Sequence, residues 1–166
     1  MKKSLTLIEV LLSLLIVTLA IGAVFLVYPT VFEGVIISSE KVKAWEETRR
    51  QLEVLKNSRF SKLYAVSYDP QNDDPVVKVF PVFGITDSSG VYYIEKMYVD
   101  TDNDGVFNET AEDLLKIEVI ISFKAGRRTL GEDNNFNGIL DPGEDQNQDN
   151  KISSPVSLHT LVLEQR

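Results

Sequence analysis

The sequence predicts an α+β fold, in which a long N-terminal helix packs on an antiparallel sheet of about four or five strands. Two observations support this prediction. The chain up to about residue 60 is apolar or rich in helix-forming residues. Beyond it, short segments rich in β-branched and aromatic residues alternate with turn-forming segments such as 87–90 and 125–126. A helix followed by a run of strands is typical of α+β domains.

The first predicted element is an apolar helix that is long enough to cross a membrane. Residues 10–28 are nineteen consecutive positions without a charge, and at about 1.5 Å per residue they span roughly 28 Å. Lys2 and Lys3 precede this segment, which favours a cytoplasmic N-terminus and an exported body. A secretory signal peptide is a weaker alternative, because its apolar part usually has about 7–15 residues.

Glu9 is the one charge inside the apolar segment, and a plain membrane anchor does not account for it. A carboxylate in a lipid-exposed helix is costly unless it has a partner. Residues 4–12, with the sequence SLTLIEVLL, resemble the processing motif of type IV prepilins and type II secretion pseudopilins. The resemblance implies that prepilin peptidase removes a leader peptide, residues 1–4, by cutting between Ser4 and Leu5, and then methylates the amine of Leu5.

The same resemblance implies how the chain is organised and where it acts. Residues 5–30 would be the transmembrane and filament-core helix, and residues 31–166 a pilin-like globular head. Subunits of this family assemble with other pilins or pseudopilins through their N-terminal helices. Glu9 would then face the N-terminal ammonium of a neighbour, since a buried carboxylate is tolerable when it is paired. We expect a minor pilin or pseudopilin of the inner membrane, with its head in the periplasm or outside, that enters an extracytoplasmic filament.

The sequence leaves two alternatives open. It does not separate a type IV pilus from a type II secretion system, and it is compatible with a membrane-tethered calcium-binding module that does not polymerise.

Helix should resume beyond a kink or break that Pro29 and Gly34 predict near residues 29–34. Residues 35–58 contain no further proline or glycine, and their apolar side chains recur at helical spacing. The predicted apolar stripe that packs on the sheet consists of Val42, Trp45, Leu52 and Leu55. Strands are predicted at 63–68, 76–83, 91–99, 115–123 and 156–163. The last two would form a hairpin that is interrupted by a long acidic insertion.

Residues 133–144 match a twelve-residue EF-hand-type calcium loop at each place that supplies a ligand. Oxygen-bearing side chains stand at the first, third, fifth, ninth and twelfth places, and Gly138 stands at the sixth, where the loop turns sharply. The expected ligands are Asp133, Asn135, Asn137, Ile139 through its carbonyl, Asp141 and Glu144. We therefore expect calcium as a structural cofactor that orders this insertion.

Two further acidic arrays match the calcium loop less completely, and they lie in the predicted acidic loops 100–113 and 130–155. The first array consists of Asp100, Asp102, Asp104 and Asn108. It lacks an acid at the twelfth place, where Ala111 stands. The second array consists of Asp145, Asn147 and Asp149, and it either completes the first site or forms a poorer one. In it, Asn150 replaces the glycine and Val156 replaces the terminal acid. The alternative for all three is an acidic surface loop without a ligand.

Charge and residue types exclude several classes of function. A formal net charge of −8 does not suit nucleic-acid binding, which needs clustered Lys and Arg. The absence of cysteine excludes disulfides, thiolate zinc sites and thiol catalysis. The single histidine, His159, lies in the last predicted strand, and no catalytic triad or phosphate-binding loop is visible. We therefore expect a structural protein and not an enzyme.

Overall fold

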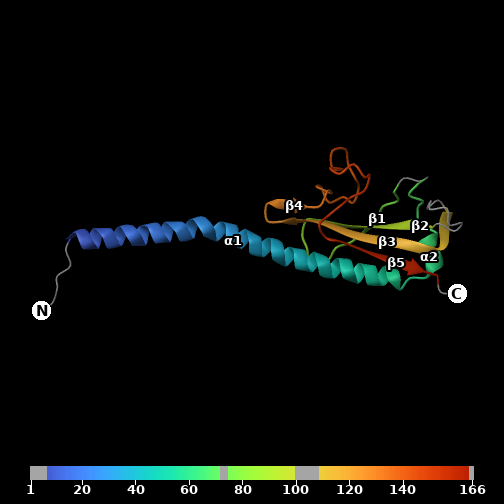
Figure 1. Cartoon of the computed structure of the whole chain (residues 1–166), viewed down its shortest axis with the longest axis horizontal. Coiled ribbons are helices and arrows are strands. Elements are labelled where there is room, and N and C mark those ends of the chain that lie inside the picture. The colour runs from blue at the N-terminus through green and yellow to red at the C-terminus, as the bar shows by residue number, and fades with distance from the viewer. Residues whose placement is uncertain (1–6, 72–74, 100–108, 165–166) are drawn as a thin grey trace. The chain divides into compact units, whose positions relative to one another are not determined.

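The computed structural model describes residues 7–71, 75–99 and 109–164. The chain divides into two compact units, residues 1–38 and 39–166, which are described separately below. Figure 1 shows the elements of both units.

Helix α1 (Leu7–Lys56) has 50 residues and belongs to both units. It continues through Pro29 and Gly34, so the predicted interruption does not break the helix. Proline removes one backbone donor, but long helical segments on both sides outweigh the loss of that single bond. The hydroxyls of Ser13 and Thr18 donate to the carbonyls one turn earlier, at 2.7 Å and 2.8 Å, so these polar groups are satisfied within the helix.

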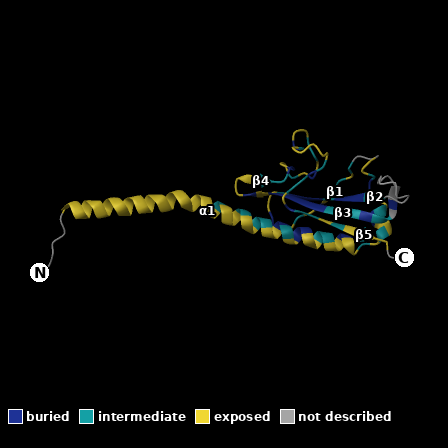
Figure 2. Cartoon of the chain, in the orientation of Figure 1, coloured by how far each residue is buried: buried dark blue, intermediate teal, exposed yellow. Residues whose placement is uncertain are grey.

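In the first unit, the helix surface is apolar and exposed. Residues 7–32 are exposed without exception, as the unbroken yellow of this segment in Figure 2 shows. They include long aliphatic and aromatic side chains such as Leu26, which is 80% exposed. By length and composition, this is a helix that could span a membrane. Such a surface needs lipid or other helices around it, because in water it would aggregate.

The second unit contains an antiparallel sheet of five strands. The strands are β1 (Lys78–Phe80), β2 (Ser88–Val99), β3 (Glu109–Ala125), β4 (Arg128–Leu130) and β5 (Ser157–Leu163). Their order is β1-β2-β3-β4, and β5 also pairs with β3. The long strand β3 pairs with β4 near its end, from Phe123 to Ala125, and with β5 from Leu114 to Ile120. The predicted α+β fold and the interrupted β3–β5 hairpin are confirmed.

One local prediction for the sheet region is wrong, and one strand was not predicted. Residues 63–68 do not form a strand, because Phe60–Tyr64 is a short helix, α2, that buries Leu63. From this segment, Tyr68 alone pairs with the sheet among the described residues, through a single parallel bridge to Glu95. The strand β4 was not predicted, since its three residues carry little strand signal beyond the Gly126 turn before them.

The part of α1 in the second unit packs on the sheet through small side chains. Ala44 and Thr48 are fully buried, and Thr48 donates to the carbonyl of Ala44 at 2.7 Å. From the predicted apolar stripe, Leu55 is buried and Trp45 and Leu52 are partly buried, whereas Val42 is 57% exposed.

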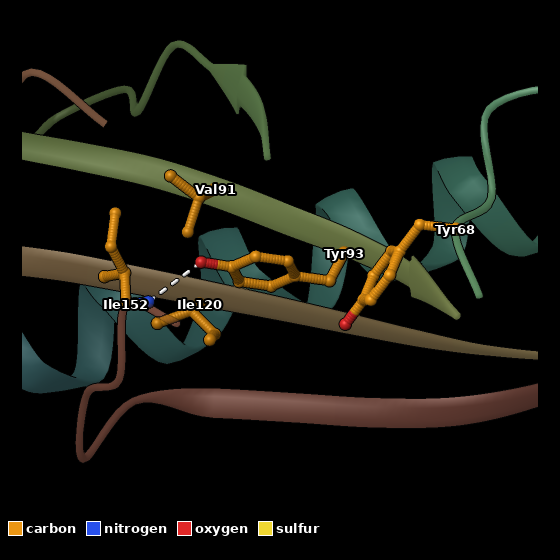
Figure 3. Packing of buried hydrophobic residues seen from close by; sticks show 5 residues of the cluster. All are labelled: Tyr68, Val91, Tyr93, Ile120 and Ile152. Atoms are coloured by element: carbon orange, nitrogen blue, oxygen red, sulfur yellow. Dashed lines mark hydrogen bonds between the residues drawn. The ribbon is translucent and has the colours of Figure 1, made fainter. Parts of the chain in front are cut away.

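Residues 131–156, which connect β4 to β5, lie over the face of the sheet opposite α1 (Figure 1). A cluster of buried side chains joins this segment to the sheet (Figure 3). Its members are Tyr68, Val91, Tyr93, Ile120 and Ile152, with Val77 and Leu140 packed against them. The acidic insertion is therefore part of the head's core, and its two inward side chains, Leu140 and Ile152, are twelve residues apart.

Candidate cation-binding loops

The segment between β4 and β5 contains two copies of one twelve-residue unit. Residues 132–141 read EDNNFNGILD and residues 144–153 read EDQNQDNKIS, so Glu, Asp and Asn recur at equal intervals. The inward residues Leu140 and Ile152 occupy the same place in each copy. We call residues 133–144 the first loop and residues 145–156 the second loop.

Hydrogen bonds from the backbone shape the first loop around its side-chain oxygens. Asp133 accepts from the amides of Asn137 at 3.1 Å and Gly138 at 2.7 Å. Asn135 Oδ1 accepts from the amide of Asn137 at 3.1 Å, and Asn137 Oδ1 accepts from that of Ile139 at 2.7 Å. These bonds bring the first, third and fifth places of the loop together, as the calcium-loop interpretation predicts.

Asp141 and Glu144 complete the arrangement of the first loop. Asp141 Oδ2 lies 2.7 Å from Asn135 Nδ2 and 2.9 Å from Asn137 Nδ2, so the ninth place faces the third and fifth. The carboxylate of Glu144 accepts from the amides of Asn134 at 2.8 Å and Asp141 at 3.1 Å. It thus ties the start of the loop to its end. Hydrogen bonds thus link each of the five predicted side-chain ligands to the loop's backbone or to one another, but among the described residues the carboxylates of Asp133, Asp141 and Glu144 do not form a group within 4.8 Å.

The second loop repeats these bonds in the same register. Asp145 accepts from the amides of Asp149 at 3.2 Å and Asn150 at 3.1 Å. Asn147 Oδ1 accepts from the amide of Asp149 at 3.0 Å, and Asp149 Oδ1 from that of Lys151 at 2.8 Å. The second array is therefore a loop of its own with the fold of the first.

The backbone conformation confirms the repeat. Phe136 and Gln148 occupy the same place in the two loops and have φ values of 60° and 61°. Gly138 and Asn150 likewise share a place, with φ values of 74° and 58°. Asparagine adopts this left-handed conformation more readily than most residues do. The absence of glycine at position 150, which counted against the second loop in the sequence, therefore does not prevent its turn.

Glu132 closes the second loop in the way that Glu144 closes the first. Its carboxylate accepts from the amide of Gln146 at 3.1 Å and from that of Ser153 at 3.0 Å. These two donors occupy the places that Asn134 and Asp141 occupy in the first loop. Oxygens of Glu132, Asp145 and Asp149 lie within 4.8 Å of one another, close enough to hold one metal ion.

Sequence reasoning missed Glu132 because the residue precedes the loops, whereas a calcium loop is read forward to its own twelfth place. That place in the second loop is Val156, which is fully buried in the core. The signal that could have found Glu132 is the repeat, since a glutamate stands directly before the first aspartate in both copies.

Glu132 and the first loop hold buried negative charge. Glu132 and Glu144 are each 7% exposed and Asp133 is fully buried. Asp133 also accepts from the hydroxyl of Ser89 on β2, at 2.5 Å. Within the described ranges, none of these three carboxylates forms an ion pair with Lys or Arg. Buried carboxylates that rely on neutral donors alone are costly, and a bound cation would offset that cost.

The donor set fits a hard cation. The side chains and the carbonyl at the seventh place offer oxygens alone, with no nitrogen or sulfur ligand, and calcium takes about six to eight oxygens in a flexible cage. The first loop offers Asp133, Asn135, Asn137, Asp141 and Glu144, and the second offers Asp145, Asn147, Asp149, Ser153 and Glu132. Of the two oxygen sets, the one around Glu132, Asp145 and Asp149 has carboxylates close enough together to hold a metal ion.

Lys151 fastens the second loop to the sheet. Its ammonium contacts the carboxylate of Glu95 on β2, which is 6% exposed and also bonds to the hydroxyl of Tyr68. Lys116 Nζ lies 3.2 Å from the same carboxylate. Burial acts to raise the pKa of Glu95, but the bonds from Lys151 and Tyr68 outweigh it, so its pKa lies below the ordinary value.

The neighbouring residue forms a second connection between the loop and the sheet. The amide of Ile152 donates to the hydroxyl of Tyr93 at 2.8 Å, as the dashed line in Figure 3 shows. Burial raises the pKa of Tyr93 to about 12, so the phenol stays protonated and accepts through its oxygen at neutral pH.

The remaining predicted residues fall elsewhere. Ser4 and Leu5 lie outside the described residues, and so does the array from Asp100 to Asn108. Glu9 lies on the exposed first turns of α1, where its carbonyl accepts from Ser13.

The fold and the loops define a class of protein: an α+β head on a long apolar N-terminal helix, an arrangement consistent with a pilin-like fold. No family model, no curated protein and no solved structure matches this chain.

Proposed function

We propose that the chain is a structural subunit, a minor pilin or pseudopilin, of an extracytoplasmic filament related to type IV pili or type II secretion filaments. The observation that supports this best is the combination of Glu9 with an exposed apolar helix from residue 7 to 32. A carboxylate so near the start of such a helix is explained when a neighbouring subunit supplies a cation.

The processing step would create that cation. Prepilin peptidase would cut between Ser4 and Leu5, and the new amine of Leu5 would meet Glu9 of an adjacent helix. In the membrane, the helix holds the subunit with its head on the extracytoplasmic side. In the filament, the apolar surfaces of neighbouring helices replace the lipid around one another.

Mass spectrometry of the membrane-extracted protein tests the processing. A chain that begins at methylated Leu5 supports the proposal, and a chain that retains residues 1–4 overturns it. Crosslinking through the N-terminal helix tests assembly separately. The wild type should crosslink to other pilins or pseudopilins, and Glu9→Val should not. A processed wild type that crosslinks to none would instead be a membrane-tethered cation-binding module.

We also propose that calcium stabilises the head by occupying the two loops. Its role would be structural, because the ions would neutralise buried carboxylates and hold residues 131–156 on the sheet. Extracellular modules commonly bind calcium at about 10⁻⁴–10⁻³ M, so head stability would follow the calcium level outside by mass action.

Thermal unfolding with and without a chelator tests this part. The melting temperature of the wild type should rise with calcium, and that of Asp133→Ala should rise less because one loop has lost its first ligand. Equal melting of the wild type in calcium and in chelator would refute the calcium proposal and leave the filament proposal intact.

A further inference from the structure

Asn137 and Gly138 form the one Asn-Gly pair in the sequence. When asparagine precedes glycine, the glycine nitrogen can attack the side-chain amide carbon, because no Cβ hinders the approach. A five-membered succinimide forms, and the amide nitrogen leaves as ammonia with the proton that the glycine nitrogen gives up. Water then opens the ring to aspartate or isoaspartate, so the balance is one water consumed and one ammonia released.

The structure exposes this pair and also restrains it. The side chain of Asn137 is exposed, whereas the backbone of Gly138 is buried beside Val79. Gly138 N donates to Asp133 Oδ2 at 2.7 Å, so the attacking nitrogen is engaged. The amide group of Asn137 is held at both ends, because its oxygen accepts from Ile139 at 2.7 Å and its nitrogen donates to Asp141 at 2.9 Å. Ring closure requires these bonds to break.

We infer that Asn137 is a deamidation site whose rate is set by opening of the first loop. In the closed loop, both reacting groups are held apart by bonds to the backbone and to the two aspartates. In the open loop, the pair reacts like an unfolded Asn-Gly sequence. The rate therefore follows the fraction of time that the loop spends open, as in other reactions that proceed through local unfolding.

The product has a consequence for the loop, and this step rests on the proposed calcium site. Deamidation to aspartate converts the Asp-Asn-Asn triplet of Asp133, Asn135 and Asn137 into Asp-Asn-Asp. The second loop already has that triplet, in Asp145, Asn147 and Asp149. The aspartate product would add one carboxylate to the first loop and strengthen its attraction for a divalent cation. The isoaspartate product would lengthen the backbone and disrupt the geometry of the loop.

The experiment incubates the full chain in detergent and measures deamidation of each peptide by mass spectrometry over time. Wild type is compared with Glu144→Gln, which weakens the closure of the first loop. Glu132→Gln is the matched control, since it makes the same change in the closure of the second loop. Asn57, which precedes Ser58 at the end of α1, provides an internal reference.

Deamidation at Asn137 should rise roughly tenfold in Glu144→Gln, a factor that corresponds to about 1.4 kcal/mol of easier opening, and should change little in Glu132→Gln. Denatured wild type should react faster than either variant. Equal deamidation rates at Asn137 in wild type, Glu144→Gln and the denatured chain would overturn the inference that opening of the first loop controls the reaction. Failure of the denatured chain to react at Asn137 would overturn the site itself. Neither outcome depends on calcium, because the comparison is made in chelator.

Discussion

Replacing Glu132 by glutamine should destabilise a loop that begins thirteen residues further along the chain. The carboxylate accepts two backbone bonds, from Gln146 and Ser153, and the side chain is 7% exposed. Glutamine has the same shape but offers one oxygen, and its NH₂ group would face one of the two backbone donors. One charge-assisted bond is lost, and that donor is left without an acceptor.

The expected loss follows from these bonds. A hydrogen bond to a charged group contributes about 1.5–3 kcal/mol, so the free energy of unfolding should fall by about 2 kcal/mol. For a head of this size, each kcal/mol lowers the melting temperature by roughly 3–4 °C. We therefore expect Glu132→Gln to melt roughly 6–8 °C below the wild type in chelator. In calcium the gap should widen, because the second loop has also lost a ligand.

Calorimetry of the detergent-solubilised full chain measures the melting temperature, and hydrogen exchange locates the change. Faster exchange is expected at the amides of Gln146 and Ser153. Glu144→Gln is the symmetrical variant and should show its effect at Asn134 and Asp141 instead. Glu53→Gln is the control, since Glu53 is 62% exposed and forms a surface pair with Arg49 that contributes little. The reasoning fails if Glu132→Gln melts like Glu53→Gln, or if it alters the exchange of Asn134 and Asp141.

Three further predictions concern buried polar groups and a glycine that lies against one of them. The folded-state pKa of Glu95 lies below its ordinary value, so the stability that its charge contributes is present above the unfolded pKa of about 4.3 and is lost as pH falls through the folded pKa. Glu95→Gln should leave Lys151 and Lys116 without their shared carboxylate and lower the melting temperature at pH 7. The melting temperature of the variant should also fall less than that of the wild type as the pH is lowered. A series of melting curves in which both proteins lose stability equally in acid would contradict this. The hydroxyl of Ser122 is buried and has no hydrogen-bond partner among the described residues, so Ser122→Ala should be neutral or slightly stabilising in chemical denaturation. Gly131→Ala in the same assay should be destabilising, because its Cβ would lie 2.2 Å from that hydroxyl at a φ of 110°, and a tolerated alanine would show that the turn can move.

The elements that were predicted correctly are those whose signal is local and periodic. The strand β3 was recognised from its alternating, β-branched residues, and its pairing with β5 from the two strands that flank the insertion. The calcium-loop pattern at residues 133–144 was visible because all of its places lie within twelve residues, and its ligand set stays a prediction. In such patterns the spacing along the chain identifies the residues of interest, so they can be predicted without knowledge of the tertiary structure.

The predictions that failed depend on contacts between distant residues. Ala44 is fully buried and Val42 is 57% exposed, and hydrophobicity alone favours the opposite choice because it does not give the rotation of the helix on the sheet. The role of Glu132 appears once its bond to Ser153, twenty-one residues away, is known. Spacing along a single loop carries no information about a ligand that comes from outside that loop.

The positions of the closing glutamates limit how this insertion can change. The first loop contains its own closing carboxylate, Glu144, whereas the second loop is closed by Glu132, which stands before the first loop. Deleting residues 145–156 would therefore leave the first loop with its closing glutamate. The first loop could exist as a single copy, whereas the second depends on a residue that the other end of the insertion supplies.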